Sequence, residues 1–301
     1  MIERPSLHAL AVFLAVVKHG TMTAAAEAEG ISQPAISAQM KVLERYYGTT
    51  LLQRTGRGVV PTATGQVVAD HAGRILALVD ELDRLVRDLE GLESGRLVIG
   101  ASSTVGEQFL PAYLGKFHAA YPHVELEVRI GNTGEITTAV VTRELDLAFV
   151  GSAPEDDELT AEPVFADDVV AFVAPGDSLL RDAPIDPAAL SGRQYVLRER
   201  GSATRDLALH CLAAAGCEPA HVIELGSNEA VKRAVEAGLG IGLLSTHAIE
   251  VERLAEFLVD LPLQGWECSR SFWLIRRRDR VLTRAEQAFL SLLPRPSTSP
   301  A

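Results

Sequence analysis

Polar and basic side chains recur at helical spacing near the start of this 301-residue chain. Gln33, Ser37 and Lys41 are four residues apart, so they share one face of a helix. Glutamine can pair with adenine through two hydrogen bonds, and serine can bind base edges or phosphates. Arg54 and Arg57 follow on a glycine-rich segment, and arginine on a loop suits the narrow minor groove of DNA. The pattern indicates recognition of double-stranded DNA.

Two short helices around a glycine turn would position these side chains. Thr21 or Thr23 is the expected N-cap of the first helix, and Ser32 that of the second. Gly30 lies between them and adopts a positive φ at little cost. Helix, turn, helix and glycine-rich hairpin together predict an all-α winged helix-turn-helix head of residues 1–62. The expected DNA contacts are Thr23, Ser32, Gln33, Pro34, Ser37, Lys41, Arg54 and Arg57.

A heptad pattern follows the head. Apolar residues recur at alternating intervals of four and three, which favours a linker helix of residues 63–92 that pairs with a second copy of the chain. The alternative is one amphipathic helix packed on its own domain. A dimer would place two heads on two half-sites of DNA. The expected contact residues are Val68, Ala72, Ile75, Val79, Leu82, Val86 and Leu89.

The remaining residues, 93–301, read as an α/β body in which strands alternate with helices over a mostly parallel sheet. Two lobes are expected, one of about 95–163 with 268–293 and one of about 164–267. Ligands of open α/β sheets bind beyond the carboxyl ends of strands. That rule selects hydroxyl and amide groups suited to a small anion, although each hydroxyl alone could simply cap a helix. The selected residues are Ser102, Ser103, Thr104, Thr133, Ser202, Thr204 and Asn228.

Composition and charge narrow the class of protein. The net charge is −12, yet residues 1–62 carry six Lys and Arg against four Asp and Glu. A mildly basic head on an acidic body permits DNA binding without indiscriminate attachment. Apolar runs are too short to span a bilayer, and no secretion signal is recognisable, so we expect a cytoplasmic protein without a membrane partner.

Cysteines and histidines show no metal-binding spacing. We expect Cys211, Cys217 and Cys268 to be reduced and inert, with a redox pair of Cys211 and Cys217 as the alternative. The sequence shows no nucleophile–base pair or Walker loop, so neither an enzyme nor a bound cofactor is expected. Residues 238–242 are rich in glycine but follow a predicted helix, which indicates a turn and not a nucleotide loop.

The head resembles the DNA-binding head of LysR-type transcriptional regulators. Two positions depart from the family pattern: Glu29 stands where leucine is usual, and Ala38 where arginine is frequent. The resemblance therefore implies DNA binding, but it does not identify the target sequence. The residues that match in order and spacing are Ala25-Ala26-Glu27, Ile31-Ser32-Gln33-Pro34-Ala35-Ile36-Ser37, Met40, Leu43-Glu44, Gly48, Leu51-Leu52, Arg54, Thr62 and Gly65.

The resemblance covers residues 6–293. It implies a two-lobed effector domain, shaped like periplasmic solute-binding proteins, that holds a small co-inducer at positions including Ser102, Thr104 and Thr133. It also implies a dimer through the linker helix, a tetramer built from two dimers, and RNA polymerase as a candidate partner. The run from Ala101 to Glu107 is similar to regulators of sulfur assimilation, so a sulfur oxyanion or a small carboxylate is the expected effector.

Two other classes compete with a regulator. The body alone would suit a solute-binding protein of the transport type, but the added head and the lack of a recognisable signal argue against it. An α/β enzyme is disfavoured because the sequence lacks a catalytic constellation.

Overall fold

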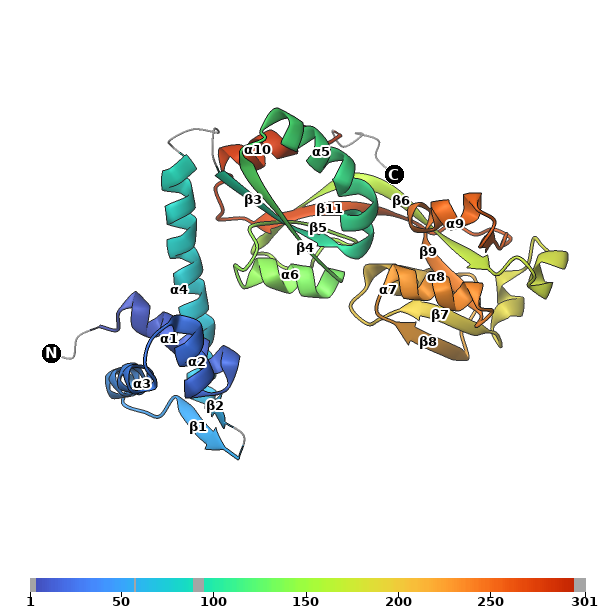
Figure 1. Cartoon of the computed structure of the whole chain (residues 1–301). Helices are drawn as coiled ribbons and strands as arrows, with labels where there is room; N and C mark the ends of the chain where they lie inside the picture. The colour runs from blue at the N-terminus through green and yellow to red at the C-terminus, as the bar shows by residue number, and fades with distance from the viewer. Residues whose placement is uncertain (1–3, 57, 89–94, 295–301) are drawn as a thin grey trace. The chain divides into compact units, whose positions relative to one another are not determined.

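The structure, a computed structural model, describes residues 4–56, 58–88 and 95–294, which form two compact units. The first unit is the expected winged helix-turn-helix followed by a long helix (Figure 1). Its elements are α1 (Leu7–His19), α2 (Met22–Glu29), α3 (Gln33–Tyr47), β1 (Leu52–Thr55), β2 (Gly58–Pro61) and α4 (Ala63–Asp88).

Side-chain caps and glycines fix where the head helices begin and end. Thr21, not Thr23, accepts from Ala24 N at the start of α2, and Ser32 accepts from Ala35 N at the start of α3. Gly30 ends α2 with a φ of 67°, the left-handed conformation that glycine adopts without strain. A Cβ at Gly58 would lie 2.2 Å from the carbonyl oxygen of Gly20, so only glycine lets the wing approach the end of α1.

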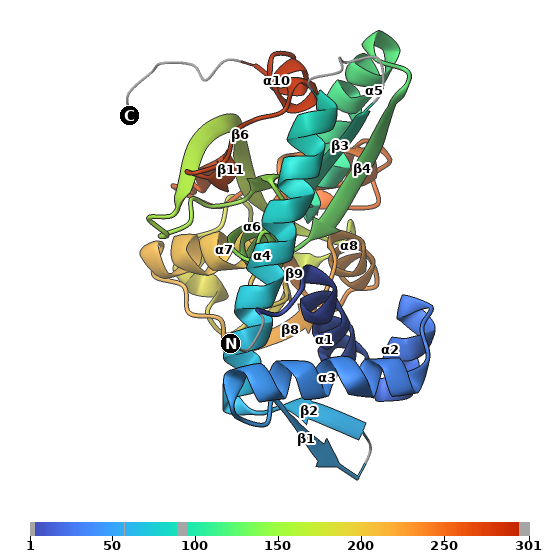
Figure 2. The same ribbon diagram turned by 90° about the vertical axis from the view of Figure 1, so that its left-hand side faces the viewer.

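The first turns of the long helix α4 pack against the head of the same chain and are not available to a partner. It runs without interruption over 26 residues (Figure 2). Val68 and Ala72 are buried in the head core beside residues such as Phe13 and Leu43. Their assignment to a dimer seam is therefore wrong, because a heptad pattern does not reveal which neighbour covers each turn.

The later seam positions lie on an open face of α4. Ile75, Leu82 and Val86 are 42%, 59% and 54% exposed, and Val79 is half-buried. Leu89 lies outside the described residues. The prediction of helix pairing therefore applies only to the turns of α4 from Ile75 onward.

The second unit alternates strands and helices, as the sequence predicts. Its elements are β3 (Gly95–Ser102), the π-turn η1 (Val105–Phe109), α5 (Leu110–Ala120), β4 (Val124–Gly131), α6 (Thr133–Val141), β5 (Leu147–Val150), β6 (Leu159–Val173), β7 (Gln194–Arg198), α7 (Ala203–Ala214), β8 (His221–Leu225), α8 (Asn228–Glu236), β9 (Ile241–Ser245), α9 (Glu250–Leu254), β10 (Val259–Asp260), β11 (Ser269–Arg277) and α10 (Arg284–Leu290), with 3₁₀ turns η2 (Ser178–Arg181), η3 (Pro187–Leu190) and η4 (Thr246–Ile249).

Two parallel sheets share two long crossover strands. In one lobe β3 pairs in parallel with β4 and β5, and in the other β7 pairs in parallel with β8 and β9. The crossovers β6 and β11 are antiparallel to each other and run between the lobes (Figure 1). Within the described residues the strand order is β4-β3-β5-β11-β6-β9-β7-β8, with β10 paired to β6. The expected pair of lobes with two crossovers is therefore present.

Helices cover both faces of each sheet. In the first lobe, Phe117 of α5 and Phe289 of α10 pack on one face, whereas Ile136 of α6 packs on the other. In the second lobe, Leu212 of α7 and Val231 of α8 are in different core clusters on opposite faces. Alternate strand residues point to opposite faces, which is why strands such as β5 are apolar at every position.

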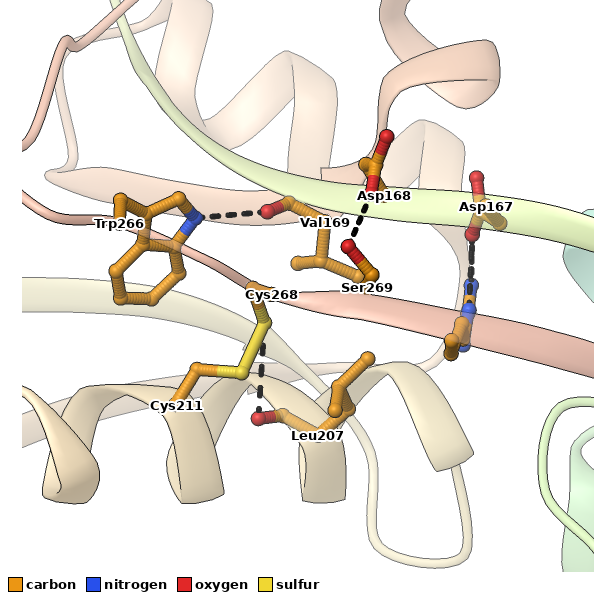
Figure 3. Close-up of a disulfide and its surroundings, with 9 residues drawn as sticks. Asp167, Asp168, Val169, Leu207, Cys211, Trp266, Cys268 and Ser269 are labelled. Atoms are coloured by element: carbon orange, nitrogen blue, oxygen red, sulfur yellow. Dashed lines mark hydrogen bonds and ion pairs between the residues drawn. A yellow bond between two sulfur atoms is a disulfide. The ribbon is translucent and has the colours of Figure 1, made fainter. Parts of the chain in front are cut away.

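The cysteines do not behave as the sequence suggested. Cys211 in α7 and Cys268, just before β11, form a disulfide, so the expectation of three reduced thiols is wrong (Figure 3). The alternative pair of Cys211 and Cys217 is wrong as well, because Cys217 is buried beside the Tyr195 hydroxyl, 3.1 Å away. The bonded residues are 57 positions apart and meet only in the folded lobe.

Candidate functional site

A cleft between the two lobes gathers residues from the carboxyl ends of several strands. Both lobes and the crossover β11 contribute to it. Six of the seven residues predicted to bind an effector line this cleft; Asn228 does not. The complete lining is Ser102, Ser103, Thr104, Asn132, Thr133, Gly151, Arg198, Ser202, Ala203, Thr204, Arg270 and Phe272.

The cleft hydroxyls are not explained as helix caps. Ser202 precedes α7 and Thr104 precedes η1, yet neither side chain makes a capping hydrogen bond. Ser227 does cap α8 through Ala230 N, as an ordinary N-cap should. The Ser102 hydroxyl is buried and has no hydrogen-bond partner among the residues that the structure describes. An unpaired buried hydroxyl is costly, so its presence favours a ligand contact over a structural role.

Arg198 ends β7 and is 3% exposed. Its Nε and Nη2 donate to the two carboxylate oxygens of Glu199, at 2.7 and 2.9 Å, and Nη2 also reaches the Ser103 hydroxyl at 3.2 Å. Burial raises the pKa of Glu199, but the hydrogen bonds and charge of Arg198, together with hydrogen bonds from the Glu199 backbone and Asn132, lower it on balance. The Arg198 guanidinium is therefore fixed in direction, and it lies where both lobes meet.

Arg270 of β11 supplies a second buried cation. Its Nε donates to Asp167 at 2.8 Å and its Nη1 to the Thr204 hydroxyl at 2.9 Å. Nη2 is also 2.8 Å from Asp167 but makes no hydrogen bond of acceptable geometry. Burial lowers the pKa of Arg270; Asp167 opposes this shift, and the nearby charge of Arg198 adds to it. Two guanidinium groups that repel each other in one cleft form an environment that an anion would stabilise.

Asn228 does not line the cleft but contacts Arg198, which does. Its Oδ1 accepts from Nη1 of Arg198, and its Nδ2 donates to Glu107 at 3.0 Å. The prediction of a direct ligand contact is therefore corrected to a positioning role. Asn228 fixes one Arg198 nitrogen and links the second lobe to η1 of the first.

The lobes are closed over the cleft. Gly134 N donates to Gly201 O across it at 3.1 Å. A Cβ at Gly151 would lie 2.7 Å from the Cβ of Ala203, so the lobes approach closely there. The remaining cavity of about 10 Å³ is close to the room that one water needs. A ligand larger than one water must therefore enter while the lobes separate.

Sequence reasoning missed both arginines. Arg198 stands at the carboxyl end of β7, so the rule that selected Ser102 would also have selected it. Arg270 has no such signal, since it lies near the start of a crossover strand and enters the cleft only because β11 returns between the lobes. Asn132, Gly151, Ala203 and Phe272 complete the lining and were also not among the seven predicted contacts.

The predicted DNA-contact residues are placed on the head as expected, although nothing in the structure tests contact with DNA. Gln33 and Lys41 are exposed along α3, with Ser37 half-buried between them. Exposed positions of the set are Thr23, Ser32, Gln33, Pro34, Lys41 and Arg54, and Arg57 lies outside the described residues. Gln33 is the first residue of α3, where a recognition helix meets base edges.

Other site types lack support among the described residues. No group of three or more His, Cys, Asp or Glu side chains in residues 4–56, 58–88 and 95–294 could hold a metal ion. No helix in the same ranges is long and apolar enough to cross a bilayer.

A winged helix-turn-helix joined to a two-lobed binding domain defines a ligand-responsive DNA-binding regulator. Comparison with known families specifies which one. Residues 7–66 match the model of the bacterial regulatory helix-turn-helix protein, lysR family, and residues 90–295 match the LysR substrate binding domain. The chain belongs to the LysR family of transcriptional regulators.

Two relatives match over nearly their whole length. The HTH-type transcriptional activator CmpR of Synechocystis is 30% identical over 97% of this chain and 96% of its own. The RuBisCO operon transcriptional regulator of Allochromatium vinosum is 33% identical over 94% of each chain. The chain is thus a transcriptional regulator that binds promoter DNA and a small-molecule effector, not a transport protein.

Solved structures agree with the fold. The regulatory domain of Synechocystis PCC6803 CcmR, in complex with 2-PG, is 29% identical, covers 66% of this chain and 95% of its own, and has a TM-score of 0.61. Full-length CbnR is 21% identical with a TM-score of 0.71, over 95% of this chain and 97% of its own. CbnR supports the fold alone, because its identity is low.

Proposed function

We propose that the interlobe cleft senses a small molecule that carries two anionic groups, a phosphate and a carboxylate, and that this ligand adjusts how paired heads sit on promoter DNA. One observation carries the proposal: Arg198 and Arg270 are both buried and both line the same small cleft. Arginine binds carboxylates and phosphates through two parallel hydrogen bonds, and two such groups suit two anionic ends.

The hydrogen-bonding capacity of the cleft fits that ligand. Arg270 keeps the N–H groups of Nη2 unused, and the Ser102 hydroxyl can donate as well. Ser202 and Thr204 lie where α7 begins, so its first backbone N–H groups add a favourable dipole for an anion. The 2-PG complex of the CcmR regulatory domain supports a ligand of this kind.

A sulfur oxyanion is the second candidate, and it rests on the likeness of residues 101–107 to regulators of sulfur assimilation. A single sulfite or sulfate is smaller than a phosphate–carboxylate compound, so the closed cavity of about 10 Å³ would need to open less to hold it. The relative named for the RuBisCO operon favours a carbon metabolite instead. The two candidates differ in the number of anionic groups, and so in how many arginines they would engage.

Calorimetric titration of the purified protein separates the candidates. We expect 2-phosphoglycolate to bind more tightly than phosphate, glycolate, sulfate, sulfite or thiosulfate, because it alone among these probes carries both anionic groups. Thr104→Val removes a cleft hydroxyl with little change in shape, and should weaken binding by about tenfold, the typical loss for one hydrogen bond to a charged group. Sulfite binding more tightly than 2-phosphoglycolate would overturn the phosphate–carboxylate assignment. Binding that is indifferent to Thr104→Val would contradict the site.

Pairing through α4 completes the proposed function. Exposed Ile75, Leu82 and Val86 lie along the part of α4 beyond the head core, and apolar residues of this kind are usually covered by a partner helix. A dimer, or a tetramer of two dimers, would then present two α3 helices to two half-sites in the cytoplasm. Closure of the two lobes around a bound ligand would change how the two heads are presented to DNA.

A further inference from the structure

The disulfide joins two elements that both shape the cleft. Cys211 lies in α7 and Cys268 directly precedes β11, with 5.8 Å between their Cα atoms, an ordinary spacing for a disulfide (Figure 3). The same α7 begins at the cleft with Ala203 and Thr204, and Arg270 follows Cys268 by two residues. Because Arg270 donates to the Thr204 hydroxyl, α7 and β11 are tied at two points, one covalent and one within the cleft.

Of the two joined elements, β11 is the more firmly held. Cys268 O accepts from Val169 N of β6 at 2.8 Å, and the neighbouring Ser269 hydroxyl donates to Asp168 at 2.6 Å. Trp266, two residues earlier, donates its indole N–H to Val169 O at 2.8 Å (Figure 3). Loss of the disulfide would therefore remove the covalent tie between α7 and a fixed strand pair, and leave the cleft end of α7 held by core packing and by the Arg270–Thr204 hydrogen bond.

A reduced Cys268 would have a hydrogen-bond acceptor close by. Its Sγ lies 3.9 Å from the carbonyl oxygen of Leu207 in α7, within reach of a weak thiol hydrogen bond. Both side chains are buried, Cys211 at 8% and Cys268 at 4% exposure, so Cys211 is the one that a reagent reaches first. Cys217 is fully buried against Tyr195 and provides an internal control that should not react.

We propose that Cys211 and Cys268 form a redox modification site whose reactant is a low-molecular-weight disulfide of the glutathione type. The Cys211 thiolate attacks one sulfur of oxidised glutathione, forms a mixed disulfide and expels one glutathione thiolate. The Cys268 thiolate then attacks Cys211 Sγ and expels the second glutathione. Two protein thiols are oxidised, one glutathione disulfide is reduced to two thiols, and the two protein protons pass to solvent or to the departing thiolates.

Oxidation should raise the affinity of the cleft for its anion. The disulfide holds α7 against β11 and so preserves the Arg270–Thr204 arrangement before the ligand arrives, which lowers the ordering cost of binding. The expected rise in affinity rests on the proposed function of the cleft, whereas formation of the Cys211–Cys268 disulfide does not. Coupling between separate sites typically changes affinity fivefold or more, so we expect at least about that factor between the two redox states.

The first experiment concerns the bond alone. The full-length protein is reduced, freed of reductant, treated with oxidised glutathione, and then alkylated in denaturant so that every free thiol is labelled before intact-mass measurement. We expect one alkylated cysteine in the parent protein and none in Cys217→Ser, with no retained glutathione in either. Cys211→Ser and Cys268→Ser should form no internal bond. Three alkylated cysteines in the treated parent, or a persistent mixed disulfide, would overturn the proposal.

The second experiment concerns coupling, with 2-phosphoglycolate and inorganic phosphate as probes on both redox states. Affinity should rise about fivefold or more on oxidation in the parent and in Cys217→Ser, but not in Cys211→Ser or Cys268→Ser. Thermal unfolding of each variant shows that it is folded. Equal affinity in both states would refute the coupling while leaving the anion site intact. Bond formation without binding of either probe would instead refute the proposed effector.

Discussion

The Ser102 hydroxyl should lower the stability of the ligand-free protein and raise its affinity for the anion. It is buried without a hydrogen-bond partner among the described residues, and such a group destabilises the ligand-free protein. Ser102→Ala should therefore raise the stability of the ligand-free protein by about 1 kcal/mol, a Tm rise of about 2–4 °C, and weaken anion binding by about tenfold. Calorimetric melting and titration measure the two effects.

The control for this prediction is Thr283→Ala. Thr283 caps α10 in a reciprocal box with Glu286, so its loss should lower stability without changing anion affinity. If Ser102→Ala instead destabilised the protein, or left binding unchanged, the hydroxyl would have a structural partner and not a ligand.

Residues of the α3 face should divide between reading bases and holding phosphates. Gln33 is exposed at the first position of α3, whereas Lys41 is two turns further along. Gln33→Ala should change the preferred operator sequence at one position, because a bidentate base contact discriminates by about 1–3 kcal/mol. Lys41→Ala should weaken all sequences by a similar factor. Fluorescence anisotropy on a set of single-base operator variants separates these outcomes, and equal loss of specificity in both proteins would contradict the division.

At the scale of elements, local signals predicted helices well and contacts between distant elements poorly. The caps Thr21 and Ser32 and the turn at Gly30 lie within a few residues of the helices that they define, so the head could be derived from sequence. The disulfide and the position of Arg270 depend instead on how β11 returns past α7, which no local pattern encodes.

The same limit explains the error in α4. Its heptad pattern correctly predicted one long helix, but not that the first turns are covered by the head itself, as Ala72 shows. The pairing prediction therefore applies to the later turns. Leu82→Glu should dissociate the dimer, because a charge would be buried in an apolar seam. Sedimentation equilibrium measures the change. Val67→Glu is the matched control, being 56% exposed on α4 but outside the heptad seam. Dissociation by both variants would argue against a specific seam.

At the scale of the whole molecule, we expect an acidic protein with a mildly basic head to gain DNA affinity mainly by pairing its heads. Residues 1–62 carry a net charge of only +2 and the rest of the chain −14, so each head has few cations for the phosphates. Observed affinity falls with salt in proportion to the number of phosphates neutralised, with a slope of about −0.9 per contact on a log–log plot. Two heads on one operator should therefore give about twice the slope of one head.

Leu82→Glu, if it separates the heads, should accordingly halve the salt slope on an operator with two half-sites and also lower affinity at low salt. Val67→Glu should keep the slope of the parent protein. On a single half-site the parent and Leu82→Glu should give similar slopes, because only one head can engage. Anisotropy titrations across a series of salt concentrations measure all three. If a variant that is monomeric by sedimentation kept the slope of the parent, a single head would make all the phosphate contacts. Pairing would then contribute to the response to the anion and not to DNA affinity.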